Sequence, residues 1–258
     1  MFKNSLSLSG LVVGMAAAAM LLVSPVKAQN VDPVADKAAI EAIVRDYLLT
    51  NPEIMIEVQQ ALEAKQQAEA KERAAQALVQ YNDVIFSSAN QGVIGNPKGD
   101  VTVVEFFDYN CGFCQRAMED MNTLISADPN INFVMKELPI LSPGSVEASR
   151  ISTAVYRLYP EQYARFHNTL LGLDGPKDGN RALETAGLMG LDLDEINAEA
   201  QKDDIVDAFQ EVNQLATALG INGTPSYVIG DEVIFGALGA DVLRQKIGNV
   251  RKCGKATC

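Results

Sequence analysis

The spacing of apolar positions changes along the chain, and each change marks an expected element. Residues 101–107 (VTVVEFF) form an almost unbroken apolar run, which is typical of a buried strand. Residues 114–126 have helical spacing and end at Asp128-Pro129, and residues 131–136 again have the pattern of a strand. A strand, a helix and a second strand in this order predict the start of a parallel α/β sheet.

The second half of the chain continues this α/β pattern after a long helical block. Residues 143–219 are predicted to form several short helices, broken at Pro160, at Gly175-Pro176 and at Gly190. Residues 226–230 and 232–235 then predict a hairpin that turns at Gly230-Asp231, and residues 240–250 a final helix. The simplest architecture is a compact α/β core with a helical insertion at about 143–219, within a domain spanning 96–258.

Residues 29–95 differ in composition and are predicted to form a separate helical region. From residue 36 to 81 the chain is rich in Ala, Glu, Gln and Lys and contains no Gly. Two helices are expected, at 34–49 and 52–81, because Asn51 can cap the second and Pro52 can occupy its first position. The longer helix has a sparse apolar seam, with Ile54 and Val58 at one end and Ala75 and Val79 at the other. Its pattern leaves open whether it packs on its own domain or acts as an oligomerisation arm.

The N-terminus has the features of a secretory signal, which we place at residues 1–28. Lys3 precedes an apolar run of 13 residues at 11–23, which is short for a membrane span, and Val26 and Ala28 suit a cleavage site. An uncleaved anchor is the alternative. Removal of the segment takes Lys3 and Lys27 with it and shifts the formal charge from −12 to −14. Such an acidic chain is not expected to bind nucleic acid or anionic membranes. Because of the predicted secretory signal, we expect the protein to be periplasmic.

The chain has four cysteines, all after the signal, and two of them form a Cys-x-x-Cys motif. Short spacing favours the pairs Cys111–Cys114 and Cys253–Cys258 among the three possible pairings. Cys111 follows a predicted strand and opens a predicted helix, where the helix dipole and free N–H groups favour the thiolate. We therefore expect Cys111 to be the exposed nucleophile. Cys114, one turn deeper, would attack a mixed disulfide and release the substrate.

A plain structural disulfide and half of a zinc site are the alternatives for the Cys111–Cys114 pair. Zinc is disfavoured because Cys253 and Cys258 lie at the far end of the chain and His167 is the only histidine. His167 lies in an apolar helical pattern and is expected to be a core residue rather than a catalytic one. Cys253 and Cys258 are expected to staple the C-terminal tail, with a copper or zinc site as the minor alternative. No cofactor or metal is predicted.

The segments EFFDYNCGFC and GTPSYVIG resemble the DsbA family of thioredoxin-fold oxidoreductases, and the resemblance covers about residues 100–250. It implies a thioredoxin fold with the helical insertion. It also implies that Glu105 is a buried acid that relays protons to and from Cys114, where a solvent-facing strand residue is the alternative. Lys136 matches the family's buried partner for this acid, and a solvated strand end is an equally open interpretation.

Thr224-Pro225 matches the family's cis-proline dipeptide. The resemblance implies that the Thr224 backbone lies beside the sulfur of Cys111. A substrate chain could pair with that backbone as an added strand.

The direction of the redox reaction is a separate question. Strong oxidases of the family usually carry Pro-His between the cysteines, whereas this chain has Gly112-Phe113, similar to the Gly-Tyr of dimeric isomerases. Thr224 also matches isomerases, and the N-terminal helices resemble those of the ScsC-like (suppressor of copper sensitivity) branch. We expect an isomerase or reductase first, a dithiol oxidase second, and a non-catalytic binding module third. The expected partners are exported protein substrates, a membrane redox protein, and further copies of the chain in a dimer or trimer.

Overall fold

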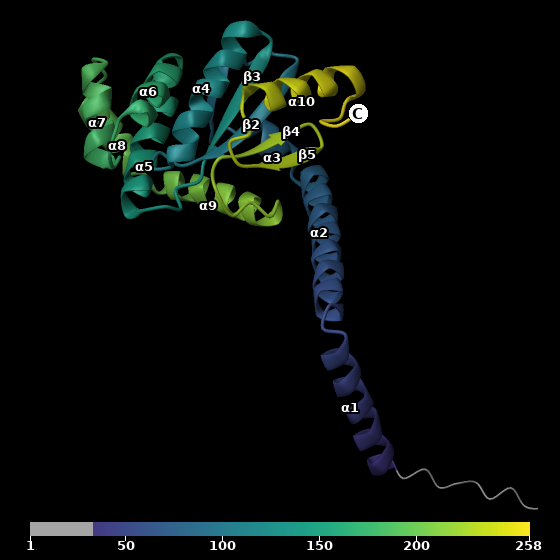
Figure 1. The fold of residues 1–258 in the computed structure, drawn as a ribbon. Helices are drawn as coiled ribbons and strands as arrows, with labels where there is room; N and C mark the ends of the chain where they lie inside the picture. The colour runs from purple at the N-terminus through teal and green to yellow at the C-terminus, as the bar shows by residue number, and fades with distance from the viewer. Residues whose placement is uncertain (1–32) are drawn as a thin grey trace, which may run out of the picture. The chain divides into compact units, whose positions relative to one another are not determined.

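The computed structural model describes residues 33–258, and side chains from residue 37 onward; the predicted signal segment lies outside the described residues. The chain divides after Gln60 into two compact units. Figure 1 gives the order of the elements along the chain. In the described part of the chain, no helix is both long enough and apolar enough to cross a membrane.

The N-terminal unit contains α1 (Pro33–Thr50) and the beginning of α2 (Ile54–Gln80). The two predicted helices are confirmed, but α2 starts two residues later than expected. Asn51 closes α1 through a hydrogen bond from its Nδ2 to the Tyr47 carbonyl at 2.9 Å, and the Asn51 carbonyl accepts from Ile54 N. Pro52 therefore lies in the turn and not in the helix.

A mixed five-stranded sheet forms the centre of the larger unit, in the order β1-β3-β2-β4-β5. Its strands are β1 (Gly92–Gly95), β2 (Val101–Phe107), β3 (Ile131–Glu137), β4 (Ser226–Ile229) and β5 (Glu232–Phe235). β2 and β3 run parallel and the other pairs are antiparallel, as in the predicted thioredoxin fold.

The sheet begins earlier in the chain than the sequence suggested. Strand β1 falls within residues 29–95, which were assigned to the helical region, and it pairs antiparallel with β3 at the sheet edge. Because Gly92 and Gly95 form its two ends, this four-residue strand lacks the apolar pattern by which a strand is predicted. A short helix, α3 (Asn82–Ser87), also precedes it.

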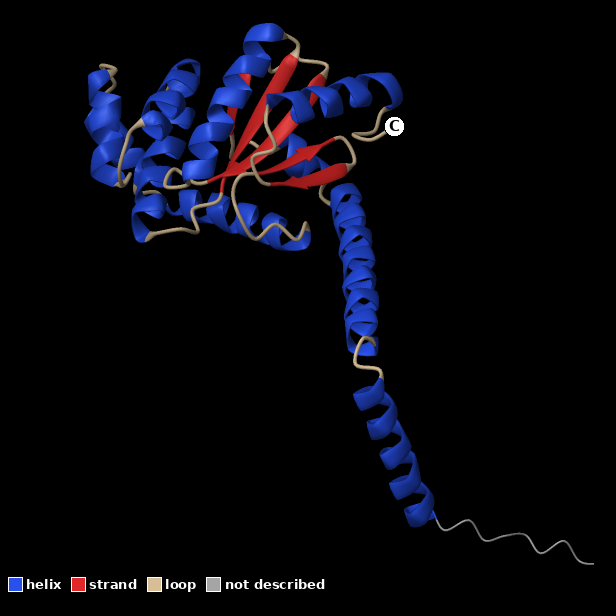
Figure 2. Ribbon diagram, viewed as in Figure 1, coloured by secondary structure: helices blue, strands red, loops and turns tan. Residues whose placement is uncertain are grey.

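Helices cover both faces of the sheet (Figure 2). Helices α4 (Gly112–Ala127) and α10 (Ala240–Cys253) pack on one face, and α3 and α9 (Asp203–Ala218) on the other. The end of α2 joins the second face, where Ala77 and Leu78 are buried in one cluster with Val104 and Phe106. Val79 of the predicted seam is 82% exposed, so this end of α2 packs on the sheet through Ala77 and Leu78 and not through that seam.

The helical insertion runs through α5 (Pro143–Leu158), α6 (Pro160–Gly172), α7 (Gly179–Leu188), α8 (Leu193–Ala200) and α9. Polar side chains cap several of these helices: Ser142 accepts from Ser145 N, and Asp178 and Asp192 do the same for α7 and α8. The predicted break at Pro160 is confirmed, because this proline opens α6. The insertion packs directly on the loop that carries the cysteine motif.

The C-terminal tail is held against the β4–β5 turn. Cys253 and Cys258 form the predicted disulfide. Within the loop that it closes, Ala256 is fully buried, and its N–H donates to the Asp231 carboxylate at 3.0 Å. The two tail cysteines are therefore bonded to each other, at the end of α10.

Candidate active site

Cys111 occupies the N-cap position of α4, directly before the first helical residue. Its sulfur accepts a hydrogen bond from Cys114 N at 3.3 Å. The first turn of α4 contains no acidic residue, so no carboxylate of that turn opposes the effect of its N–H groups and dipole on the sulfur. This end of α4 is therefore suited to hold a thiolate.

The Thr224-Pro225 peptide bond is cis, as predicted. The Cys111 thiol donates to the Thr224 carbonyl at 3.2 Å, so the two segments meet although 113 residues separate them. β4 begins at the next residue, Ser226, and hydrogen-bonds to β2. The sheet therefore fixes the position of the Thr224 backbone beside the sulfur.

The two cysteines are free thiols with opposite properties. Side-chain hydrogen bonding from Cys114 is the main cause that lowers the pKa of Cys111 to about 6. The Thr224 side chain and the backbone N–H groups of Cys114 and Phe113 lower this pKa further, against the effect of burial. Burial raises the pKa of Cys114 far above its ordinary range. Cys114 is completely buried and Cys111 is 6% exposed. The prediction of an exposed Cys111 is therefore wrong in degree, although Cys111 is the more accessible of the two.

Glu105 lies on β2 and is 2% exposed, so the solvent-facing alternative is wrong. Burial is the main cause that raises the pKa of its carboxyl to about 8, and negative charge on Cys111 and Asp120 raises it further. Its Oε2 atom is buried and has no hydrogen-bond partner among the described residues. A carboxyl group in this state holds its proton near neutral pH and can exchange it with a neighbouring thiol.

Lys136 is not the partner of Glu105. In the parallel β2–β3 pair, Glu105 lies opposite Met135, and Lys136 lies opposite Phe106. Because neighbouring residues of a strand point to opposite faces, Lys136 lies on the other face of the sheet from Glu105. Its Nζ donates to the Val84 carbonyl of α3 at 2.6 Å, and it is 1% exposed, so the solvated alternative is also wrong.

Asp108 and Asn110 organise the loop before Cys111, and neither residue was predicted from the sequence to belong to the site. The Asp108 carboxylate accepts from Asn110 N at 2.8 Å and from Ile140 N and Leu141 N at 2.9 Å each. Asn110 Nδ2 donates to Lys177 O and Ser145 Oγ, and its Oδ1 accepts from Lys177 N at 2.7 Å. In the sequence, the run Asp-Tyr-Asn between the predicted strand and the predicted helix could have identified this loop, since Asp and Asn favour such loops.

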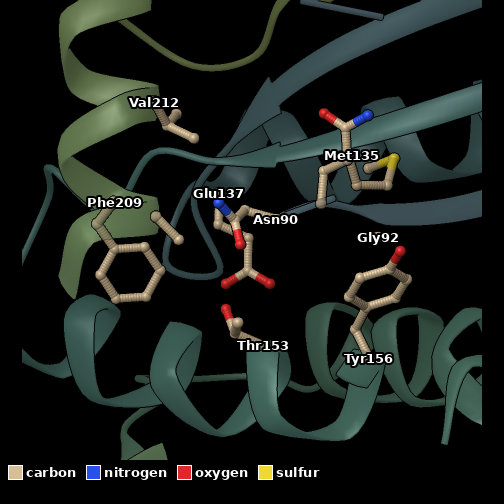
Figure 3. A pocket seen from close by; sticks show the side chains of 10 residues that line it. Asn90, Gly92, Met135, Glu137, Thr153, Tyr156, Phe209 and Val212 are labelled. Atoms are coloured by element: carbon tan, nitrogen blue, oxygen red, sulfur yellow. The ribbon is translucent and has the colours of Figure 1, made fainter. Parts of the chain in front are cut away.

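A second buried acid, Glu137, is the last residue of β3. Its carboxyl accepts from Ser152 Oγ at 2.7 Å, and burial raises its pKa to about 8. It lines a cavity of about 10 Å³ between β3, α5 and α9, and Figure 3 shows its carboxyl group facing Thr153. This volume admits about one water molecule, so the cavity is too small for a substrate.

His167 is a core residue, as predicted. It is 1% exposed, its ring packs edge-on against Phe107, and burial lowers its pKa to about 3. Its Nδ1 lies 3.4 Å from the Tyr109 hydroxyl. The imidazole is therefore neutral at physiological pH, and it packs among the rings of Phe107, Tyr109 and Tyr163.

Comparison with known proteins gives matches over both parts of the chain. Residues 102–248 match the DSBA-like thioredoxin domain, and residues 36–69 match the copper resistance protein ScsC N-terminal domain. Disulfide bond formation protein D of Bacillus subtilis is 25% identical over an alignment of 183 residues, which covers 65% of this chain and 82% of that protein.

Two solved structures illustrate the similarity. A thioredoxin-like oxidoreductase from Silicibacter pomeroyi is 38% identical with a TM-score of 0.63, covering 66% of this chain and 98% of its own. A linker-deletion variant of Proteus mirabilis ScsC is 25% identical with a TM-score of 0.65, covering 86% of this chain and 99% of its own. The ScsC similarity therefore includes much of the N-terminal region as well as the catalytic fold. With more than half of its length in the matched domain, the chain belongs to the family of DSBA-like thioredoxin-domain proteins and is a thiol–disulfide oxidoreductase of the DsbA/ScsC type.

Proposed function

We propose that this oxidoreductase isomerises and reduces disulfides in exported proteins, with Cys111 as nucleophile and Cys114 as resolving thiol. The observation that carries the proposal is the position of the Cys111 sulfur, at the start of α4 and 3.2 Å from the Thr224 carbonyl. A thiolate there can attack a substrate disulfide while the substrate backbone pairs beside Thr224-Pro225.

In the proposed reaction, the Cys111 thiolate attacks one sulfur of a substrate disulfide. A mixed disulfide forms, and the other substrate sulfur leaves as a thiolate. In isomerisation, a second substrate thiolate attacks the mixed disulfide and releases Cys111, so nothing is oxidised overall. In reduction, Cys114 passes its proton to Glu105 and attacks Cys111, and the substrate leaves as a thiolate. The Cys111–Cys114 disulfide is then reduced by a membrane redox partner.

The N-terminal helices support an oligomeric form. On α1, the side chains of Ile40, Ile43 and Val44 are 60%, 69% and 50% exposed. Such a row of exposed apolar residues on one helix is typical of an interaction surface. We propose that the N-terminal helices within residues 29–95 contribute this contact between copies of the chain, in a dimer or trimer. The catalytic domain, predicted at 96–258, also includes the end of α2, α3 and β1. A second active site facing the first would help to hold a misfolded substrate.

A dithiol oxidase is the second candidate, and one observation favours it. The lowered pKa of Cys111, to about 6, stabilises the reduced form. A stabilised reduced form makes a disulfide more oxidising. We place this activity second because Gly112-Phe113 and Thr224 depart from the pattern of strong oxidases.

Refolding of ribonuclease distinguishes the candidates. We expect the protein, kept in a glutathione buffer, to restore activity to scrambled, fully oxidised ribonuclease, and Cys111→Ser to abolish the effect. The matched control is the double variant Cys253→Ser/Cys258→Ser, which removes the tail disulfide without freeing a thiol and leaves the site intact. Faster oxidation of reduced ribonuclease without rescue of the scrambled form would favour the oxidase. We place the reaction in the periplasm, following the predicted signal at 1–28.

The oligomer is tested separately by light scattering. We expect the protein to be an oligomer and the double variant Ile40→Asp/Val44→Asp to be a monomer. The exposed substitution Lys71→Glu on α2 serves as the control. A monomeric protein without substitutions would contradict the proposed role of the arm.

A further inference from the structure

Tyr227 lies directly beside Glu105, in the strand that follows the cis-proline. In the antiparallel β2–β4 pair, Glu105 and Tyr227 are opposite each other. Opposite residues of such a pair point to the same face, with Cβ atoms about 4.5–5.5 Å apart. Tyr227 is 1% exposed and belongs to the same core cluster as Cys114.

Both side chains carry a buried polar atom without a partner. Among the described residues, neither Oε2 of Glu105 nor the hydroxyl of Tyr227 has a hydrogen-bond partner. Buried polar groups are rarely left in this way, and each exception calls for an explanation such as a catalytic role. The two atoms belong to neighbouring side chains on one face of the sheet, next to the thiol that must lose a proton.

We propose that the Tyr227 hydroxyl donates a hydrogen bond, directly or through one water molecule, to the Glu105 carboxylate when Glu105 ionises. Tyr227 is then a positioning residue, which aims Glu105 at Cys114 and stabilises its charged form. This inference rests on the proposed function, in which Glu105 receives the proton of Cys114.

The charges around Glu105 explain why a neutral donor is needed there. Burial, and then negative charge on Cys111 and on Asp120 of α4, raise the pKa of Glu105, whereas no positive group among the described residues lowers it. Asp120 is itself engaged, because its Oδ1 accepts from Ala240 N of α10 at 2.9 Å. α10 contributes the apolar residues Leu243 and Ile247 to this core, and β3 contributes Met135. Among these neighbours, Tyr227 can donate a hydrogen bond to the carboxylate without adding charge.

The test follows the reaction of the reduced, full-length protein with dithiobis(nitrobenzoate) in rapid-mixing experiments. Attack by the Cys111 thiolate breaks the reagent disulfide and releases a first thionitrobenzoate. Cys114 then gives its proton to Glu105 and attacks Cys111, and a second thionitrobenzoate leaves as the Cys111–Cys114 disulfide forms. The first release reports on Cys111, and the second reports on the proton transfer from Cys114.

We expect Tyr227→Phe to leave the first release unchanged and to slow the second about tenfold near neutral pH, as for the loss of one hydrogen bond to a charged group. The pH midpoint of the second release should rise by about one unit, and the rates should converge at high pH. The matched control is Tyr163→Phe, which removes the hydroxyl of another fully buried tyrosine, in α6, and should change neither phase.

Double substitution tests the dependence on Glu105. In a Glu105→Gln protein, in which the second release should be slow at every pH, Tyr227→Phe should cause no further loss. A Tyr227→Phe profile that superimposes on the unsubstituted protein would overturn the inference, as would an equal effect of Tyr163→Phe. An unsubstituted protein that releases no second thionitrobenzoate would overturn the proposed function of the cysteine pair, and this inference with it.

Discussion

Replacement of Asn110 by Ala is expected to destabilise the protein by more than the loss of one hydrogen bond would. Its side chain links the segment before Cys111 to two parts of the helical insertion. Nδ2 donates to Lys177 O at 2.8 Å and to Ser145 Oγ at 3.0 Å, and Oδ1 accepts from Lys177 N at 2.7 Å. A fourth contact, to Ser142 Oγ, is long at 3.4 Å and is left out of the estimate.

The magnitude follows from these three hydrogen bonds. Each contributes about 0.5–1.5 kcal/mol net, and Ser145 is fully buried, so water cannot readily replace the lost partner. We expect Asn110→Ala to lower the free energy of unfolding by about 2–3 kcal/mol, a large part of the roughly 5–15 kcal/mol of a typical domain. Urea unfolding of the reduced protein measures the change, and the m-value should stay constant.

Asn96 provides the matched control. It also joins two segments, through Nδ2 to Pro129 O at 3.0 Å and from Lys98 N to Oδ1 at 2.9 Å, but both hydrogen bonds are exposed. Asn96→Ala should therefore cost less than about 1 kcal/mol. Equal losses for the two variants would refute the reasoning. So would full additivity of Asn110→Ala with Ser145→Ala, because these residues share a hydrogen bond.

Three further predictions concern titration and the tail. Alkylation of Cys111 by iodoacetamide should be half-maximal at about pH 6, and a midpoint near the ordinary thiol pKa of about 8.5 would contradict the site geometry. Because folding lowers this pKa, the ionised Cys111 adds to the free energy of unfolding of the reduced protein. This added stability is fully present above pH 9.0 and is lost as the pH falls to about 6. Burial raises the pKa of Glu137 to about 8, so the protonated carboxyl contributes fully to folding stability below pH 4.5, and this stability is lost as the pH rises through 8. The free energy of unfolding of Glu137→Gln, measured against pH, should lack this decline. Replacing Cys253 and Cys258 by Ser should leave the reductase rate unchanged and cost about 2 kcal/mol of stability, since the disulfide closes a short loop.

The sequence predicted those parts of the fold that depend on local pattern. The apolar run at 101–107, the helix after Cys111 and the hairpin at 226–235 have strong local signs, and all three are present. Strand β1 has none, because it is four residues long with glycine at both ends, and only its pairing with β3 defines it. The buried end of α2 likewise depends on contacts with β2 that no helical periodicity reveals. A truncation that removes the arm must therefore stop before Ala77, because Leu78 and the α3 residue Ile85 belong to the core.

The strand pairing of Glu105 shows most clearly why the surroundings of this residue could not be predicted from the sequence. All seven residues of β3 are buried, so no alternation of apolar and polar positions reveals which face each occupies. A shift of one residue decides whether Lys136 or Met135 meets Glu105, and the register selects Met135. Lys136 is consequently not placed to hold the charge of Glu105, and the pKa of Glu105, which burial raises, also responds to the charge of Cys111. While Cys111 is a thiolate, Glu105 tends to keep its proton; once a mixed disulfide removes that charge, the carboxyl ionises more readily. In the proposed reaction, the base thus becomes available at the step in which Cys114 must lose its proton.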